Sequence, residues 1–143
     1  MSYVTADAML KKFGESELIT LTDNERPYKD AINQEKLQAA IDAANTEIDC
    51  YIAGRYRLPL QTTPPFLTDL GCNIARYHAC LGNVATNSDI KTRYDNAVKI
   101  LEKIAKGLIQ LGGMPAGDSE PVKTSSNNVM FTVGRHDFGG RNW

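Results

Sequence analysis

The side chains best suited to metal binding or thiol catalysis lie in one short stretch that contains Cys72, His78 and Cys80. A structural zinc site needs four convergent ligands, usually including a close cysteine pair, and a catalytic cysteine needs a base within hydrogen-bonding reach. The stretch has helical periodicity, and at about 100° per residue Cys72 and Cys80 share one face whereas His78 lies off it. We therefore expect a partly exposed histidine and neither a metal site nor a catalytic centre.

The cysteines of the chain, Cys50, Cys72 and Cys80, also bear on its redox chemistry. All of them fall within helical patterns. Cys72 and Cys80 would lie about 12 Å apart along one helix, which is too far for a disulfide bond between them. We expect reduced and buried thiols at all of these positions.

A second group with chemical potential is Arg55-Tyr56-Arg57, because cations beside an aromatic ring can grip phosphate or stack on a base. No basic field surrounds the triplet, and the net charge of the chain is −1, which gives no case for general nucleic-acid binding. We favour a structural role in which Tyr56 packs in the core and both arginines form salt bridges. Nucleic-acid contact through Arg55, Arg57 and the third long helix is the alternative.

The other motifs of catalysis and cofactor binding give no support for an enzyme. The sequence has no Gly-x-x-x-x-Gly-Lys-Ser/Thr loop and no Gly-x-Gly-x-x-Gly after a strand. The carboxylate pairs Glu15 with Glu17 and Asp23 with Glu25 lie in polar segments, where a solvated surface is expected. The prediction is a protein without catalytic activity, cofactor or metal.

The elements that must position these residues are helical. Thr5 is a good N-cap and Gly14 a good stop for a short helix over residues 6–13, and a second helical segment is predicted over residues 15–21. Three long amphipathic helices follow, because apolar side chains recur every three or four residues. They are predicted over residues 34–53, from Pro65 to Gly82, and over residues 90–111. Gly54 is the predicted stop of the first of these helices and Gly112 of the third, in which Gly107 is an internal weak point.

Residues 112–143 are rich in glycine and polar side chains, which is typical of a flexible arm. Alternation within the arm predicts one short strand with three side chains on one face, Val129, Phe131 and Val133. A strand without a partner is a candidate for addition to another protein, and a local hairpin or packing on its own helices is equally open. The arm ends with Trp143, a further candidate contact. The predicted fold is an all-α bundle over residues 1–111 with this extended arm.

The charge of the helical part is divided unevenly along the chain. Residues 1–50 carry 5 basic and 10 acidic side chains, whereas residues 51–111 carry 8 basic and 4 acidic ones. The two halves can complement each other inside one bundle, or an acidic face of one subunit can meet a basic face of its neighbour. The sequence leaves both interpretations open.

Two further observations concern location. No apolar run approaches the ~20 residues that a membrane helix needs. The first residues lack the basic and apolar regions of a signal peptide. We expect a protein that is made in the cytoplasm and has no membrane contact.

The order of motifs along residues 3–111 resembles the gene-product-36-like family of Mu-like bacteriophages and prophages. The most specific mark is Gly54-Arg55-Tyr56-x-Leu58-Pro59-Leu60, which follows Ile48-Asp49-x-Tyr51-Ile52. The other matching motifs are Tyr3-Val4-Thr5, Met9-Leu10, Phe13-Gly14, Glu17-Leu18-Ile19-x-Leu21-Thr22-Asp23, Ala40-x-x-x-Ala44, Pro64-Pro65, Asp69-Leu70, Ile74-Ala75-Arg76-Tyr77 and Arg93-Tyr94-x-x-Ala97.

The resemblance implies a virion structural protein related to the head–tail connector, or adaptor, proteins of long-tailed phages. Such a protein is a mostly helical subunit of a homo-oligomeric ring beneath the portal at the capsid neck. The implied partners are the portal protein and the downstream neck and tail-completion proteins, and DNA passes through the ring without specific binding. No catalytic site is implied. A small helical regulatory or nucleic-acid-binding module is the alternative function.

Overall fold

The computed structural model describes residues 2–80 and 88–111. In this part of the chain the secondary structure is helical, which confirms the predicted all-α class. The predicted arm over residues 112–143, with its strand residues and Trp143, lies outside the described residues. The helices are α1 (Ala6–Phe13), α2 (Glu15–Thr22), α3 (Gln34–Ile52), α4 (Pro65–Ala79) and α5 (Ser88–Ala105). None of these helices is both long enough and apolar enough to cross a membrane.

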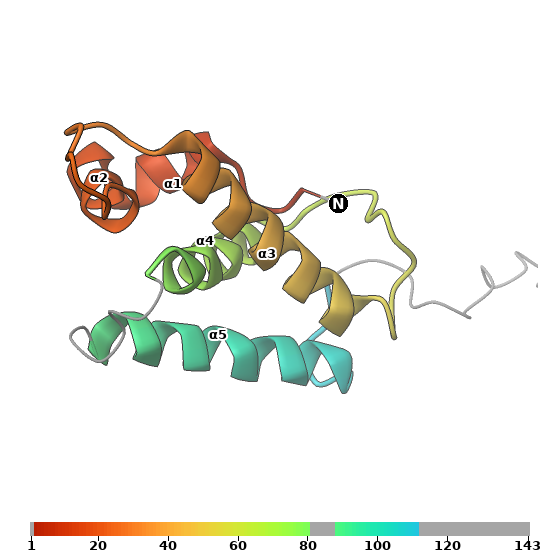
Figure 1. Ribbon diagram of the computed structural model, residues 1–143. Coiled ribbons are helices and arrows are strands. Elements are labelled where there is room, and N and C mark those ends of the chain that lie inside the picture. The colour runs from red at the N-terminus through yellow and green to blue at the C-terminus, as the bar shows by residue number, and fades with distance from the viewer. Residues whose placement is uncertain (1, 81–87, 112–143) are drawn as a thin grey trace, which may run out of the picture.

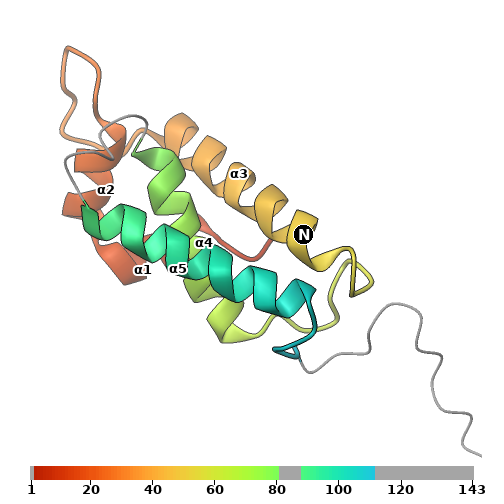
Figure 2. The ribbon, with the colours of Figure 1, turned by 90° about the horizontal axis from the view of Figure 1, so that it is seen from below.

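Helix α4 lies at the centre of the bundle and contacts each of the other helices. Figure 1 shows α3 and α5 on either side of α4, with the short α1–α2 pair at the end where α3 begins. Figure 2 shows α5 running across α4. The long helices bury one apolar side each in a shared core, which contains Leu37, Ala40, Ile41, Ala44, Ile48 and Ile52 of α3, Leu67, Leu70, Ile74, Ala75 and Ala79 of α4, and Ile90, Ala97, Leu101 and Ile104 of α5.

The N-terminal helices begin and end where local chemistry predicts. The Thr5 hydroxyl oxygen accepts a hydrogen bond from the Ala8 N–H, which satisfies one of the free donors at the start of α1. Gly14 has φ +86°, a conformation that favours glycine, and its N–H donates to the Leu10 carbonyl. The same residue therefore ends α1 and precedes α2.

The predicted glycine stop of the first long helix is wrong. Helix α3 ends at Ile52, whose carbonyl accepts hydrogen bonds from the N–H groups of Arg55 and Tyr56. Gly54 does not have a positive φ, and a Cβ added there would meet no atom within 4 Å. The turn after α3 therefore does not require glycine at this position.

The third long helix ends earlier than predicted, because Gly107 rather than Gly112 terminates it. Helix α5 ends at Ala105, and Gly107 has φ +79°. The Gly107 N–H donates to the Ile104 carbonyl at 3.0 Å, and the Leu108 N–H donates to the Lys103 carbonyl at 2.9 Å. This pair of hydrogen bonds around a left-handed glycine is a Schellman motif, which supplies donors to free carbonyl groups in the last turn of a helix.

Polar contacts fix the N-terminal segment on α3. Asn45 Oδ1 accepts hydrogen bonds from the N–H groups of Tyr3 and Val4, at 2.9 and 3.1 Å. The Tyr3 hydroxyl donates to Asp49 at 2.7 Å. Burial, together with this bond, raises the pKa of the Tyr3 phenol, so the group stays protonated and acts as the donor.

A close approach at Gly71 brings the N-terminal segment, α3 and α4 together. A Cβ added at Gly71 would overlap with the side chain of Val4 and would lie 3.0 Å from Ile48 Cδ1. Val4, Ile48 and Gly71 are all buried, so none of them can move aside without repacking the core. The contact requires glycine because of space and not because of backbone conformation.

We predict that Gly71→Ala lowers the free energy of unfolding by about 1–2 kcal/mol, because overpacking costs up to about 3 kcal/mol and the helix propensity of alanine returns about 1 kcal/mol. Gly54→Ala is the matched control, since its Cβ would meet open space, and it should change stability by less than about 0.5 kcal/mol. Urea denaturation followed by circular dichroism measures both. Equal stabilities of the two variants would contradict the close-packing argument.

Candidate interaction surface

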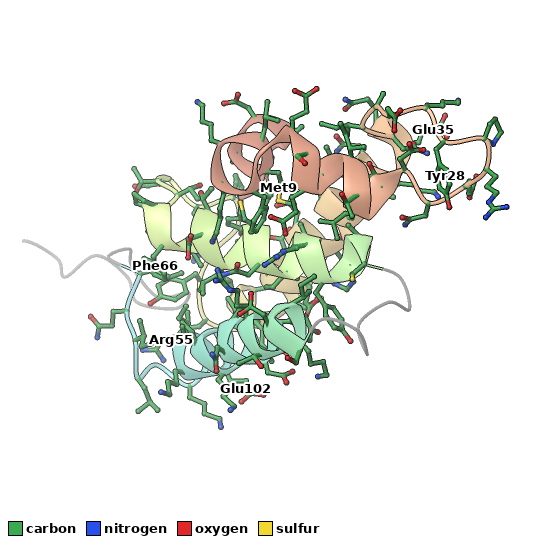
Figure 3. The ribbon with its side chains drawn as sticks, turned by 90° about the vertical axis from the view of Figure 1, so that its left-hand side faces the viewer. Met9, Tyr28, Glu35, Arg55, Phe66 and Glu102 are labelled. Carbon is green, nitrogen blue, oxygen red and sulfur yellow. The ribbon has the colours of Figure 1, made fainter. Side chains whose placement is uncertain are left out.

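The predicted triplet Arg55-Tyr56-Arg57 lies in the turn after α3, beside the C-terminal end of α5 (Figure 3). The Arg55 guanidinium lies directly over Gly107, where an added Cβ would overlap with it. A cation at this position faces the negative end of the α5 helix dipole. Gly107 is therefore constrained twice, by its positive φ and by the arginine that covers it.

The residues of the triplet have different environments. Tyr56 is buried, as predicted, and its hydroxyl oxygen accepts a hydrogen bond from the Leu111 N–H at 3.1 Å. Arg55 is half-buried and Arg57 is exposed. Within the described residues neither arginine forms an ion pair, so the predicted salt bridges are not found in this part of the chain. Of the three side chains, only that of Tyr56 lies in the core.

Basic side chains gather where the turn after α3 meets the last turns of α5, and we call this surface the basic end. None of its cations forms an ion pair among residues 2–80 and 88–111; they are Arg55, Arg57, Lys99, Lys103 and Lys106. Glu102 is the acidic residue among them. Two exposed apolar side chains belong to this end of the bundle, namely Phe66 at the start of α4 and Leu108 just after α5.

The opposite end of the bundle is formed by the loop over residues 23–33, which projects beyond α2 and the start of α3 (Figures 1 and 2). Tyr28 lies in this loop and is exposed (Figure 3). Asp23 Oδ2 accepts hydrogen bonds from the N–H groups of Lys29 and Asp30, both at 2.9 Å, which fixes the loop. We call this surface the acidic end, because its carboxylates outnumber Arg26 and Lys29; they are Asp23, Glu25, Asp30 and Glu35.

The loop of the acidic end encloses a hollow of about 510 Å³. Its apolar wall includes Pro27, Ala31 and Ile32, and carboxylates of the acidic end line it as well. Glu25 forms an ion pair with Lys36 at 3.1 Å, while Glu35 is exposed and forms none within the described part of the chain. Arg26 and Lys29 line the hollow too, so it combines an apolar surface with charged groups among which carboxylates are in excess.

The cysteines do not form a reactive centre with His78. Cys72 and Cys80 are buried and free, and burial raises the pKa of both thiols, which is the opposite of what activates a nucleophile. Cys50 is exposed, so the prediction of a buried thiol is wrong there. The physical reason is periodicity, since Cys50 lies two residues from Ile48 and is turned about 200° from it around the helix. Among the described residues, no three His, Cys, Asp or Glu side chains are placed to hold a metal ion.

A polar cluster between the three long helices was not predicted from the sequence. Glu47 of α3 accepts a hydrogen bond from the Tyr94 hydroxyl of α5 at 2.8 Å, and it contacts His78 Nε2 of α4 at 2.7 Å. The Tyr94 ring stacks on Tyr77 with 3.9 Å between centroids. Burial first, and then the Glu47 carboxylate, raise the pKa of the Tyr94 phenol, which keeps it protonated as a donor. The cluster ties α3, α4 and α5 together.

A signal for this cluster is present in the spacing of α3. Glu47 lies three residues after Ala44 and four before Tyr51, so it falls within the inward stripe. A carboxylate in such a stripe indicates polar partners on the facing helices, because burying it without them is costly. The side chain of His78 is 31% exposed, in agreement with the partly exposed histidine expected there.

We predict that Glu47→Ala lowers the free energy of unfolding by about 1–2 kcal/mol, because it leaves the partly buried Tyr94 hydroxyl and His78 without their acceptor. Asp42→Ala is the matched control on the exposed side of the same helix. The Asp42 carboxylate accepts a hydrogen bond from Gln38, and the substitution leaves the backbone contacts of this position in place. It should change stability by less than about 0.5 kcal/mol. Urea denaturation at neutral pH compares the two, and a control that costs as much as Glu47→Ala would refute a special role for the cluster.

Comparisons with known proteins agree with the order of motifs in the chain. A family model described as "Bacteriophage Mu, Gp36" matches residues 3–132. The chain is also similar to the "Mu-like prophage FluMu protein gp36" of Haemophilus influenzae, with 34% identity over 108 residues that cover 76% of this chain and 74% of that protein. The chain therefore belongs to the bacteriophage Mu Gp36 family.

Proposed function

We propose that this protein is a head–tail connector, a virion structural protein that forms a ring beneath the portal at the capsid neck. Membership of the Mu Gp36 family supports a phage or prophage protein. The observation that carries the connector role is the chemical difference between the basic end and the acidic end of one small helical bundle. A ring subunit contacts a neighbour on each side through different patches, and head-to-tail contacts close into a ring when the rotation between subunits permits.

In this role the protein works through contacts and not through catalysis, and it requires no cofactor. Its partners are the portal protein on one side of the ring and the neck and tail-completion proteins on the other. The protein is made in the bacterial cytoplasm and ends in the virion neck. DNA passes through the ring without specific binding.

We predict that a prophage in which this gene is disrupted produces filled heads and separate tails that do not join. The physical reason is that a missing adaptor removes the surface on which the tail docks. Electron microscopy of induced lysates measures the fraction of joined particles, and a plasmid copy of the intact gene should restore it. Joined, infective particles without the protein, or immunogold labelling away from the neck, would refute the connector role.

The cations of the basic end, which form no ion pair with other described residues, favour one second candidate, a nucleic-acid-binding module. Lys and Arg side chains that lack protein partners are suited to phosphate contacts. A DNA-retardation titration at moderate salt separates the two functions. We expect the connector to bind duplex DNA weakly and without sequence preference, whereas tight, sequence-dependent retardation would favour the module.

A further inference from the structure

Leu108 is largely exposed in the part of the chain that the structure describes. Its side chain is 74% exposed, more than the other exposed large hydrophobic residues of the described chain, which are Leu10, Tyr28 and Phe66. In a Schellman motif the residue after the left-handed glycine usually packs on the residue five positions before it, whose carbonyl its N–H also binds. Here that residue is Lys103, which offers no apolar surface at its charged tip. Leu108 is therefore exposed at the end of a helix whose last residues include Lys103 and Lys106, and it follows Gly107, which the Arg55 guanidinium covers.

The acidic end offers the complementary surface. Its hollow has the apolar wall of Pro27, Ala31 and Ile32, and its volume of about 510 Å³ is ample for a leucine side chain together with part of the turn that carries it. Glu25 and Glu35 line the same hollow. Arg26 and Lys29 also line it, but the carboxylates outnumber them. An exposed apolar side chain near cations on one surface thus corresponds to a partly apolar hollow with an excess of carboxylates on the other.

The two surfaces cannot meet within one chain. The loop over residues 23–33 and the C-terminal turn of α5 lie at opposite ends of the bundle in both views (Figures 1 and 2). Tyr28 and Arg55 lie at opposite corners of the molecule in Figure 3. The partner that brings both surfaces together is therefore a second copy of the chain.

The charges also favour a second copy over nucleic acid at the basic end. The basic end carries five cations and Glu102, whereas residues 22–36 carry four carboxylates and three cations, one of which, Lys36, pairs with Glu25. These net charges are opposite in sign, and opposite potentials steer association and fix its register. A phosphate backbone would satisfy the cations, but it would leave Leu108 in water.

We propose that copies of this chain associate head to tail, with Leu108 of one copy in the hollow of the acidic end of the next copy. Lys103 and Lys106 then face Glu25 and Glu35 of that copy. This inference rests on the proposed function, because it names the contact between neighbouring subunits of the ring. The contact joins two different surfaces, so an open chain of copies keeps one free surface of each kind, at its two ends, until the ring closes.

The first test is the self-association of the full-length chain, measured by analytical ultracentrifugation at low salt and at about 0.5 M salt, where exposed charges are screened. We expect association that weakens with salt. Leu108→Ser should weaken it by about tenfold or more, as loss of a central apolar anchor does. Leu10→Ser is the matched control, because Leu10 is an exposed leucine on α1 outside both ends, and it should leave association unchanged. A parent chain that stays monomeric throughout, or equal behaviour of the two variants, would overturn the proposal.

The second test separates head-to-tail contact from other modes of association. One variant carries Lys103→Glu and Lys106→Glu, and the other carries Glu25→Lys and Glu35→Lys. Each alone should be monomeric. Mixed together they should associate, because one contact is unaltered and the other has both sets of charges exchanged. A mixture that stays monomeric would overturn the proposal. Circular dichroism spectra that match the parent show that the variants are folded.

A final set of experiments distinguishes this inference from the connector role and from DNA binding. In the prophage, Leu108→Ser protein that still joins heads to tails would overturn the contact and leave the connector role standing. Head-to-tail association by a protein that is absent from virions would leave the contact standing and overturn the connector role. If Lys103→Glu with Lys106→Glu abolishes binding of a duplex DNA fragment but leaves self-association intact, the basic end serves nucleic acid and the proposed contact is wrong.

Discussion

The bundle depends on the close approach to α4 at Gly71. Helix α4 contacts every other helix of the described chain, and a helix that is approached from several sides must carry small residues. Gly71, Ala75 and Ala79 fill this role and are buried. At Gly71 there is room only for the Val4 side chain and the tip of Ile48. This contact and the hydrogen bonds of Tyr3 and Val4 to α3 together fix the N-terminal segment, which leads into α1 and α2.

The packing around α4 also decides what happens to the uneven charge of the sequence. Part of it is neutralised inside the bundle, because Arg76 of α4 pairs with Glu17 of α2, and Lys12 of α1 pairs with Asp69 of α4. Other charged side chains stay at the surface, since the core excludes those that lack partners, and they include the cations of the basic end and the carboxylates of the acidic end. Internal complementation is therefore present in the described residues, and contact between charged faces of neighbouring subunits stays a prediction.

The cluster of Glu47, His78 and Tyr94 shows how polar side chains specify the arrangement of otherwise apolar helices. An apolar interface tolerates small rotations of one helix against another, whereas a carboxylate with two partners tolerates only the rotation that satisfies both. Glu47 accepts from α5 and contacts α4 at once. A fixed arrangement of the long helices in turn fixes the position of the C-terminal turn of α5, and with it the direction in which Leu108 points.

The sequence by itself determined the class of fold, the Thr5 cap, the Gly14 boundary and the family, because helix periodicity, capping and turn chemistry act between residues a few positions apart. It misplaced the end of α5, where two glycine signals competed and Gly107, which has a positive φ, follows the end of the helix. The exposure of Cys50, the arginine over Gly107 and the partners of Glu47 were decided by tertiary structure alone. These features join residues many positions apart, and the distances between such residues are set by how whole helices pack and not by local spacing.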